Sequence, residues 1–332
     1  MVYSKKRENT LIFAIRDNLI LLNLDNPAQS KVYADHHARI TAIAEQPTAG
    51  RIAFGDEKGM VTVVTLKQDG TFSKDKDYPF TAGEINQVLW SVDGQRLIGV
   101  GAGSDIKANA VMADTGSKSG TILGFDATQL CSDFAQVEKR VALISAGEGK
   151  DILVHEGFPF KGQGKAVLSN HTNFINQVKV SPDNSKYVTV SSDKQLILRD
   201  IPNHEQLDVV AKAHSAGIYD VKWINEAHFA TCSADNTVNI WSVSAEGKLE
   251  LTRTLDKAEK MLLPNHVLGF AQGDTGENLW AITFGGDLRN FENVISGTNP
   301  GASFGETRHN YLISDMLAFN QVIFYASETK VF

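Results

Sequence analysis

A short apolar pattern recurs along the chain at intervals of 41 to 49 residues. Each copy begins with a large apolar residue, has a second apolar residue three positions later, and often ends in Trp. Clear copies begin at Ile40, Ile85, Ile175 and Ile218, and weaker copies begin at Phe134, Val267 and Leu312. A period of this length indicates a repeat architecture in which each unit packs on its neighbours.

The units are built from strands. Between residues 171 and 213, turn residues separate the runs INQVKVS, KYVTVSS, LILRDI and LDVVAKA, and β-branched runs bounded in this way are typical of strands. No segment keeps a 3.6-residue apolar period long enough for a substantial helix. Four antiparallel strands in a unit of this length form one β-propeller blade. The sequence therefore predicts an all-β, seven-bladed propeller with the recurring pattern in the inner strands.

The two ends of the chain hold incomplete units. Six full units run from about residue 36 to 305, residues 1–35 supply about three strands, and residues 306–332 supply a new opening with two short strands. A propeller closes its ring because an open blade exposes an unpaired edge. In the simpler arrangement, 1–332 is one propeller closed by its two termini. In the alternative, residues 306–332 start a second propeller that this chain lacks. The sequence does not decide whether the chain is whole or half of a two-propeller protein.

Polar residues recur at matching places in two adjacent units. The set is His214, Ser233, Asp235 and Trp241 in one unit and His171, Ser191 and Asp193 in the unit before it, where Arg199 replaces the Trp. This pattern resembles a WD repeat, which implies a buried hydrogen-bonded chain that fixes the blade. The competing interpretation is a catalytic Ser-His-Asp triad. We favour the structural role because an active site would not be duplicated, and we expect no enzyme activity.

A longer stretch is similar to the actin-interacting protein 1 family, whose pattern E-G-P-P-F-K-F matches EGFPFK at 156–161. The match continues through HTNFINQVKVSPD at 171–183 and AHSAGIYDVKW at 213–223. Members of that family have two propellers and help cofilin to sever and disassemble actin filaments. The resemblance implies actin filaments and cofilin as partners. We also expect a cytoplasmic, cytoskeletal location and a monomer. The alternative is a general WD-repeat scaffold for another complex.

Five residues are candidates for partner contact: Asp105, Glu148, Lys150, Phe160 and Lys161. Their loops are expected at one rim of the third and fourth blades. For Phe160, the alternative is a wedge packed between blades. Two positions depart from the family pattern, because Ala102 replaces an acidic residue and Gly162 replaces an aromatic one. Lost anchors of this kind can weaken a contact by about 2 kcal/mol or more, so family activity does not transfer automatically.

Composition narrows the remaining function classes. A net charge of −7 argues against a general nucleic-acid binder, which needs a basic surface. No apolar run approaches the length of a membrane span. Cys131 and Cys232 cannot form a disulfide framework. The chain has neither His-x-x-x-His nor Cys-x-x-Cys, so we expect no metal site and no cofactor.

Overall fold

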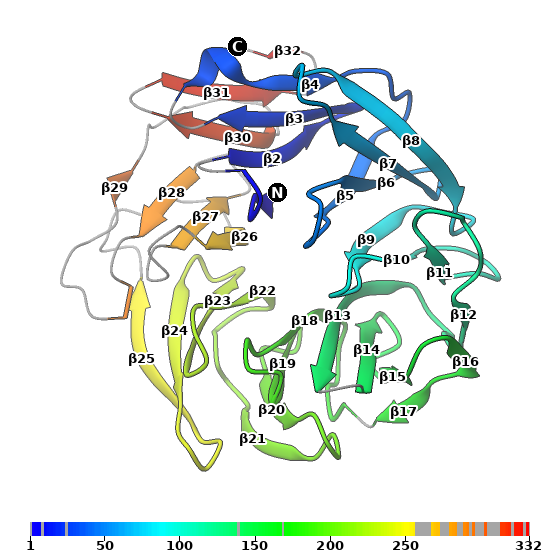
Figure 1. Ribbon diagram of the computed structural model, residues 1–332. Coiled ribbons are helices and arrows are strands. Elements are labelled where there is room, and N and C mark those ends of the chain that lie inside the picture. Colours follow the sequence, from blue (N-terminus) through cyan, green and yellow to red (C-terminus); the bar gives the residue numbers. More distant parts are fainter. Residues whose placement is uncertain are drawn as a thin grey trace. The chain divides into compact units, whose positions relative to one another are not determined.

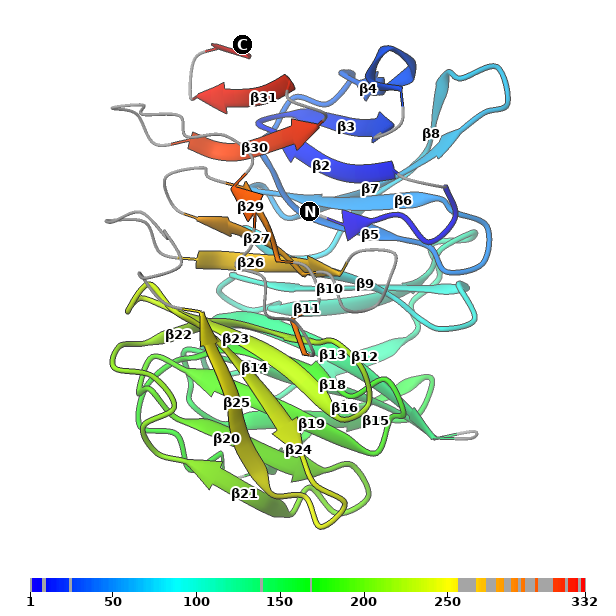
Figure 2. The same cartoon turned by 90° about the vertical axis from the view of Figure 1, so that its left-hand side faces the viewer.

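The computed structural model describes residues 2–7, 10–23, 26–137, 140–167 and 169–255, and beyond residue 255 mainly the strands. The chain divides into two compact units, Met1–Asn170 and His171–Phe332. Within the described residues the only helix is the single 3-10 turn η1 (Pro27–Gln29), and all other regular structure is strand. Figures 1 and 2 show these strands as successive small sheets.

The first unit holds four successive sheets, which we number as blades 1 to 4. Blade 1 is β1 (Val2–Tyr3), β2 (Thr10–Ile15), β3 (Asn18–Asn23) and β4 (Lys31–Tyr33), and blade 2 is β5 (Ile40–Glu45), β6 (Ile52–Asp56), β7 (Met60–Leu66) and β8 (Phe72–Pro79). Blade 3 is β9 (Ile85–Trp90), β10 (Arg96–Gly101) and β11 (Ala108–Met112). Blade 4 is β13 (Gln129–Val137), β14 (Arg140–Gly147), β15 (Ile152–Glu156) and β17 (Lys165–Val167). A separate pair joins β12 (Gly120–Leu123) to β16 (Phe160–Gln163).

The second unit holds blades 5 to 7 and one further sheet. Blade 5 is β18 (Ile175–Val180), β19 (Lys186–Ser191), β20 (Leu196–Asp200) and β21 (Gln206–Val210), and blade 6 is β22 (Ile218–Trp223), β23 (His228–Ser233), β24 (Val238–Val243) and β25 (Leu249–Leu255). Blade 7 is β26 (Val267–Gln272), β27 (Leu279–Thr283), β28 (Leu288–Phe291) and β29 (Ala302–Ser303). The last sheet is β30 (Ile313–Phe319), β31 (Val322–Ser327) and β32 (Lys330–Val331). The predicted all-β, seven-bladed fold class is confirmed.

The terminal segments form sheets of their own. Blade 1 holds four strands, one more than the sequence pattern indicates, and β30 to β32 form a separate three-stranded sheet. Whether the two termini complete one ring stays a prediction.

The first strand of each of blades 2 to 7, and of the last sheet, carries a β-bulge at its second residue. In β5 the register moves from Ile40↔Asp56 to Ala42↔Gly55, and β18 and β22 shift in the same place. The shift in β13 falls between Gln129 and Cys131. Blade 4 therefore opens at Gln129 and not at Phe134 as the pattern suggested. The period is obscured there because Gln129 and Ser132 occupy the two places that are apolar elsewhere.

The bulged residue binds the next blade. Thr41 Oγ1 donates to the carbonyl of Ile85 at 2.5 Å. Asn86 Nδ2 donates to the carbonyl of Gln129 at 2.7 Å, and Asn176 Nδ2 donates to the carbonyl of Ile218 at 2.7 Å. Each bond ends on the first residue of the neighbouring blade, so the bulges align successive inner strands within each unit.

We expect Asn86→Ala and Asn176→Ala each to lower the free energy of unfolding by about 1 kcal/mol, because each leaves an inner-strand carbonyl without its donor. Urea unfolding of each variant measures the loss. Thr41→Ser keeps the hydroxyl and serves as the control that should stay close to the parent protein. Unchanged midpoints for both Asn variants would contradict a stabilising role for these bonds.

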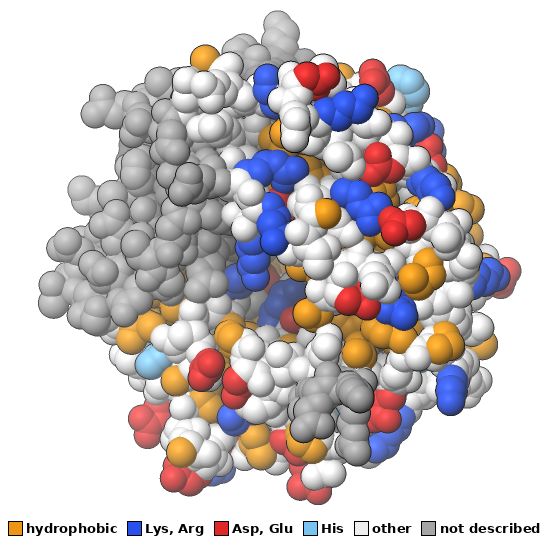
Figure 3. Space-filling view, viewed as in Figure 1, with side chains coloured by type: hydrophobic (Ala, Val, Ile, Leu, Met, Phe, Trp, Pro, Cys, Tyr) orange, Lys and Arg blue, Asp and Glu red, His pale blue; other side chains and the backbone are white. Residues whose placement is uncertain are grey.

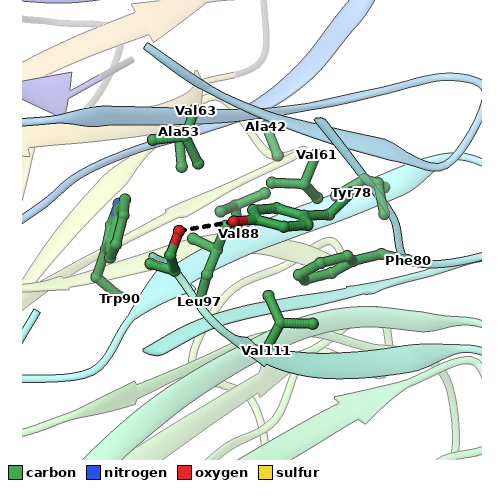
Figure 4. Close-up of a cluster of buried hydrophobic side chains, with 12 residues drawn as sticks. Ala42, Ala53, Val61, Val63, Tyr78, Phe80, Val88, Trp90, Leu97 and Val111 are labelled. Carbon is green, nitrogen blue, oxygen red and sulfur yellow. Dashed lines mark hydrogen bonds between the residues drawn. The ribbon is translucent and has the colours of Figure 1, made fainter. Parts of the chain in front are cut away.

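The blades pack through apolar side chains. Between blades 2 and 3, Val61, Val63 and Tyr78 meet Val88 and Leu97 in one buried cluster (Figure 4). Tyr78 Oη donates to the carbonyl of Ala113 at 2.6 Å, which satisfies the only polar atom of that side chain. Dry packing of this kind holds neighbouring blades together.

Candidate functional site

A buried polar chain runs through blade 6. His214 Nδ1 lies 3.2 Å from Asp235 Oδ2, and His214 Nε2 lies 2.8 Å from Thr231 Oγ1. Trp241 Nε1 donates to the same hydroxyl at 2.9 Å. Because an ionised carboxylate only accepts, Nδ1 carries the proton, and Nε2 accepts from the Thr231 hydroxyl. Every member of the chain thus has its partner, as a buried network requires.

The hydroxyl of this chain belongs to Thr231 and not to Ser233, which the sequence pattern assigned to it. Ser233 Oγ donates to the carbonyl of Gly217 at 2.9 Å and accepts from the Asp235 amide at 3.2 Å. It therefore holds the turn that carries Asp235. Thr231 could have been found from strand alternation, because residues 229, 231 and 233 share a face of β23. Phe229 pairs with Trp241, and Thr231 lies two residues closer to that pair than Ser233 does.

Blade 5 repeats the arrangement without the Trp. His171 Nδ1 lies 3.0 Å from Asp193 Oδ2 and His171 Nε2 lies 3.0 Å from Thr189 Oγ1. Here Thr189 takes the place that the sequence gave to Ser191, which instead accepts from the Asp193 amide at 3.1 Å. The same geometry in two adjacent blades fits a structural role.

Blades 2 and 3, in the first unit, fill the same places differently. Blade 2 keeps a bond of 3.1 Å between His36 and Asp56, but the His36 ring packs on Phe54, with ring centroids 4.9 Å apart. In blade 3 the Phe80 ring lies against Gly99. In these two blades an aromatic ring packs where blades 5 and 6 have a hydrogen-bonded member of the polar chain. The repeat pattern is therefore weak in their sequence.

The two aspartates titrate at unusually low pH. Burial raises the pKa of Asp193, but hydrogen bonds from His171 and from the Thr172 and Gln195 amides outweigh it and hold the pKa at about 2. The pKa of Asp235 is also lowered, because bonds from His214 and Thr237 outweigh the effect of burial.

Because the folded-state pKa lies below the unfolded value, this stabilisation is present above about pH 4 and is lost as the pH falls toward about 2. We expect Asp193→Asn to be less stable than the parent near pH 5, and the gap to shrink as the pH is lowered through this window. Urea midpoints at several pH values measure the gap. A gap that does not change with pH would contradict the assigned ionisation.

The segment 156–164, which carried the family resemblance, links blades 3 and 4. Strand β16 pairs in parallel with β12, from Gly120↔Phe160 to Leu123↔Gln163. The Gly164 amide donates to the Leu123 carbonyl at 3.2 Å, and the His155 ring bonds the same oxygen at 2.8 Å. Burial lowers the pKa of His155, so a neutral ring donates from Nε2. The segment thus joins the edge of blade 3 to blade 4.

Phe160 lies inside this junction. Its side chain is 2% exposed and packs with Ile98, Ile122 and Leu143, and its ring lies 4.9 Å from that of Phe158. The side chain is not available to a partner in this structure. The alternative interpretation, a wedge between blades, describes its position.

The other candidate residues are exposed but do not form one group. Asp105 lies in the β10–β11 turn, and Glu148 and Lys150 lie in the equivalent β14–β15 turn of the next blade. Lys161 follows the far end of β15. Successive turns of an antiparallel sheet emerge at opposite ends, so a strand of about 16 Å separates the Glu148 turn from the Phe160–Lys161 segment. The expected single rim is therefore wrong for this segment.

Within the described part of the chain, no cluster of three or more His, Cys, Asp or Glu is placed to hold a metal ion. The same residues include no helix long and apolar enough to cross a membrane.

Comparison with known proteins agrees with this geometry. The family model described as "WD domain, G-beta repeat" matches residues 162–200 and 206–242. These residues reach from β16 into β24 and include both His-Thr-Asp chains. Two solved structures share the fold. The WD40 β-propeller domain of Doa1 has a TM-score of 0.63 at 16% identity and covers 89% of this chain and 92% of its own. The C-terminal WD40 domain of Sif2 has a TM-score of 0.67 at 15% identity, over 83% of this chain and 75% of its own.

Curated relatives extend the similarity beyond these two repeats. WD repeat-containing protein 1 of Bos taurus is 30% identical over 239 residues, which are 71% of this chain and 39% of that protein. Actin-interacting protein 1 of Drosophila melanogaster is 29% identical over 231 residues, 69% of this chain and 37% of that protein. The matched part of the chain thus spans well under half of these relatives. We conclude that the chain is a WD-repeat protein with the β-propeller fold, similar over about 70% of its length to WD repeat-containing protein 1 and Actin-interacting protein 1.

Proposed function

We propose that this protein binds actin filaments and promotes their cofilin-dependent disassembly. It works by binding and not by catalysis, as a monomer of the cytoplasm and cytoskeleton. Disassembly by a binding protein requires a preference for cofilin-bound or terminal subunits over intact filament, because a ligand shifts an equilibrium only by its differential affinity.

The observation that carries this proposal is the similarity to Actin-interacting protein 1 over 69% of the chain. The segment 156–164 adds support, because its departure from ordinary WD repeats has a structural purpose here. Its strand β16 leaves blade 4 and pairs with β12 beyond blade 3. The Phe160 ring is buried at this junction and packs against Ile98 and Leu143.

The contact surface that we propose is formed by the β10–β11 and β14–β15 turns. These equivalent turns of adjacent blades bring Asp105, Glu148 and Lys150 to the same end of their sheets, and all three side chains are exposed. Ala102 stands in the first turn, where its amide donates to the Glu84 carbonyl at 2.8 Å. Exposed charges of this kind mainly tune encounter rate and specificity.

The test is co-sedimentation with actin filaments, with and without cofilin. We expect the parent protein to sediment with cofilin-bound filaments, and the double variant Asp105→Lys, Glu148→Lys to sediment about tenfold more weakly, since it replaces two rim carboxylates by opposite charges. Glu205→Lys, Glu226→Lys is the matched control, because it reverses two exposed carboxylates in the β20–β21 and β22–β23 turns.

The outcomes distinguish an error in the proposed contact surface from an error in the proposed function. If the parent sediments and the double variant sediments equally well, these two turns are not the contact. If the parent does not sediment under either condition, the actin proposal fails. The general WD-repeat scaffold would then be the better account of the chain.

A further inference from the structure

A buried carboxylate fixes the β1–β2 turn at the start of the chain. Glu45, whose side chain is 4% exposed, accepts from Ser4 Oγ at 2.6 Å, from the Lys5 amide at 2.8 Å and from the Arg7 guanidinium at 2.6 Å. Arg7 also donates to the Gly50 carbonyl at 2.7 Å. The turn is therefore held in one conformation, and the Lys5 and Lys6 side chains project from it into solvent.

Two neighbouring turns continue the surface. Gly50, in the β5–β6 turn, packs against the Lys6 side chain. Gln46 of that turn donates to the Gly94 carbonyl in the β9–β10 turn at 2.5 Å. The Ala113 amide donates to the Gln95 carbonyl at 2.8 Å. The turns between first and second strands of blades 1 to 3 thus form one contiguous face of the first unit, which we call the basic face.

This face carries more positive than negative charge. Its arginines are each held by one carboxylate, in the pairs Arg7–Glu45, Arg51–Asp114 and Arg96–Asp93. Lys76 also belongs to this face, because its ammonium donates to the Asp114 carbonyl. It adds a further positive charge. No described carboxylate lies within ion-pair distance of Lys5 or Lys6. A group of Lys and Arg side chains is visible beside the N-terminal strands in Figure 3.

The location of this charge is unusual for the protein. The whole chain has a net charge of −7, and the opposite ends of blades 2 to 4 expose Glu57, Asp105 and Glu148. The basic face also carries an apolar side chain, since Val92 is 57% exposed in the β9–β10 turn. A rigid basic surface with an exposed apolar residue is complementary to a segment that has both acidic and apolar side chains.

We propose that the basic face docks an acidic segment of a partner protein, with Lys5 and Lys6 pairing its carboxylates and Val92 contacting an apolar side chain between them. The charge pattern favours a short acidic segment over DNA or an anionic membrane. Those polyanions extend beyond the face and would meet the negative charge of the rest of the protein. The surface lies at the opposite ends of the blades from Asp105 and Glu148, so the proposal is independent of the actin contact.

The experiment measures binding of a fluorescein-labelled peptide in which Glu alternates with Ser around one central Leu. We expect fluorescence anisotropy to show binding that weakens as salt rises, because exposed charges are screened. Lys5→Glu, Lys6→Glu should weaken it about tenfold, as expected for reversing two exposed charges. The matched control is Lys58→Glu, Lys212→Glu, which makes the same charge change at two exposed lysines that are not part of the turns forming this face.

Four further measurements, with a second peptide, a Val92 variant, lipid vesicles and DNA, complete the test. A peptide with Gln in place of Glu should not bind, and Val92→Ser should weaken the acidic peptide without changing the salt dependence. Equal weakening by the control pair would mean that net charge, and not this face, controls binding, and would overturn the proposal. Binding to phosphatidylserine vesicles or a short DNA duplex without binding to the peptide would overturn it as well.

Discussion

Gly120→Ala is expected to lower the free energy of unfolding by about 3 kcal/mol or more, because backbone strain and a steric clash act together at this position. Gly120 has a φ of +95°, and a Cβ atom there would lie 2.2 Å from both the amide nitrogen and the carbonyl oxygen of Phe160. Both contacts are to the backbone of a paired strand, so no side-chain rotation relieves them. The β12–β16 ladder must separate, which exposes the apolar junction between blades 3 and 4.

Gly162→Ala is the matched control in the same ladder. Gly162 pairs with Ile122 and has a φ of +74°, but nothing lies within 4 Å of an added Cβ. Gly162→Ala therefore tests the backbone strain of a positive φ alone, which costs about 1 kcal/mol. Urea unfolding measures both variants, and amide hydrogen exchange at residues 120–123 and 160–163 reports whether the ladder has opened. Equal losses for the two glycines would show that the close approach of β12 to β16 contributes nothing.

The sequence predicted the blades because their pattern is local. An apolar pair three residues apart, with turn residues about every ten positions, is readable without knowing which strands pair. The opening of blade 4 was missed because Gln129 and Ser132 hide the apolar period. The β-bulge that all these strands share is visible only from the pairing register.

The β12–β16 ladder could not be predicted in the same way. It pairs residues about 40 positions apart in parallel, and no local pattern marks such a pair. The family resemblance singled out residues 156–161, but a short aromatic segment rich in glycine gives no sign of whether Phe160 is buried or exposed. Its pairing partner, the 120–123 segment, looks like an ordinary loop after Gly116.

The sequence predicted a buried polar chain of the right type, but it assigned the wrong hydroxyl residue to that chain. His, Asp and Trp are rare enough in strands to be recognised by spacing. Two hydroxyl residues in each blade, Thr231 and Ser233 or Thr189 and Ser191, are equally compatible with that spacing. Only the side-chain distances show that the threonine joins the chain and that the serine holds the turn.

Thr231→Val is therefore expected to destabilise the protein by about 2–4 kcal/mol, because the nearly isosteric change leaves two buried groups, Trp241 Nε1 and His214 Nε2, without their shared hydroxyl. In blade 5 the equivalent Thr189→Val deprives only His171 Nε2, so its loss should be about half as large. Thr231→Ser keeps the hydroxyl and gives up one methyl group, which makes it the control for packing. Urea unfolding of the three variants should rank Thr231→Val as the least stable, with Trp241 fluorescence reporting the local change. If Thr231→Val and Thr231→Ser unfold at the same urea concentration, the Thr231 hydroxyl does not stabilise the folded protein. Its hydrogen bonds to His214 at 2.8 Å and to Trp241 at 2.9 Å then have no net effect on folding.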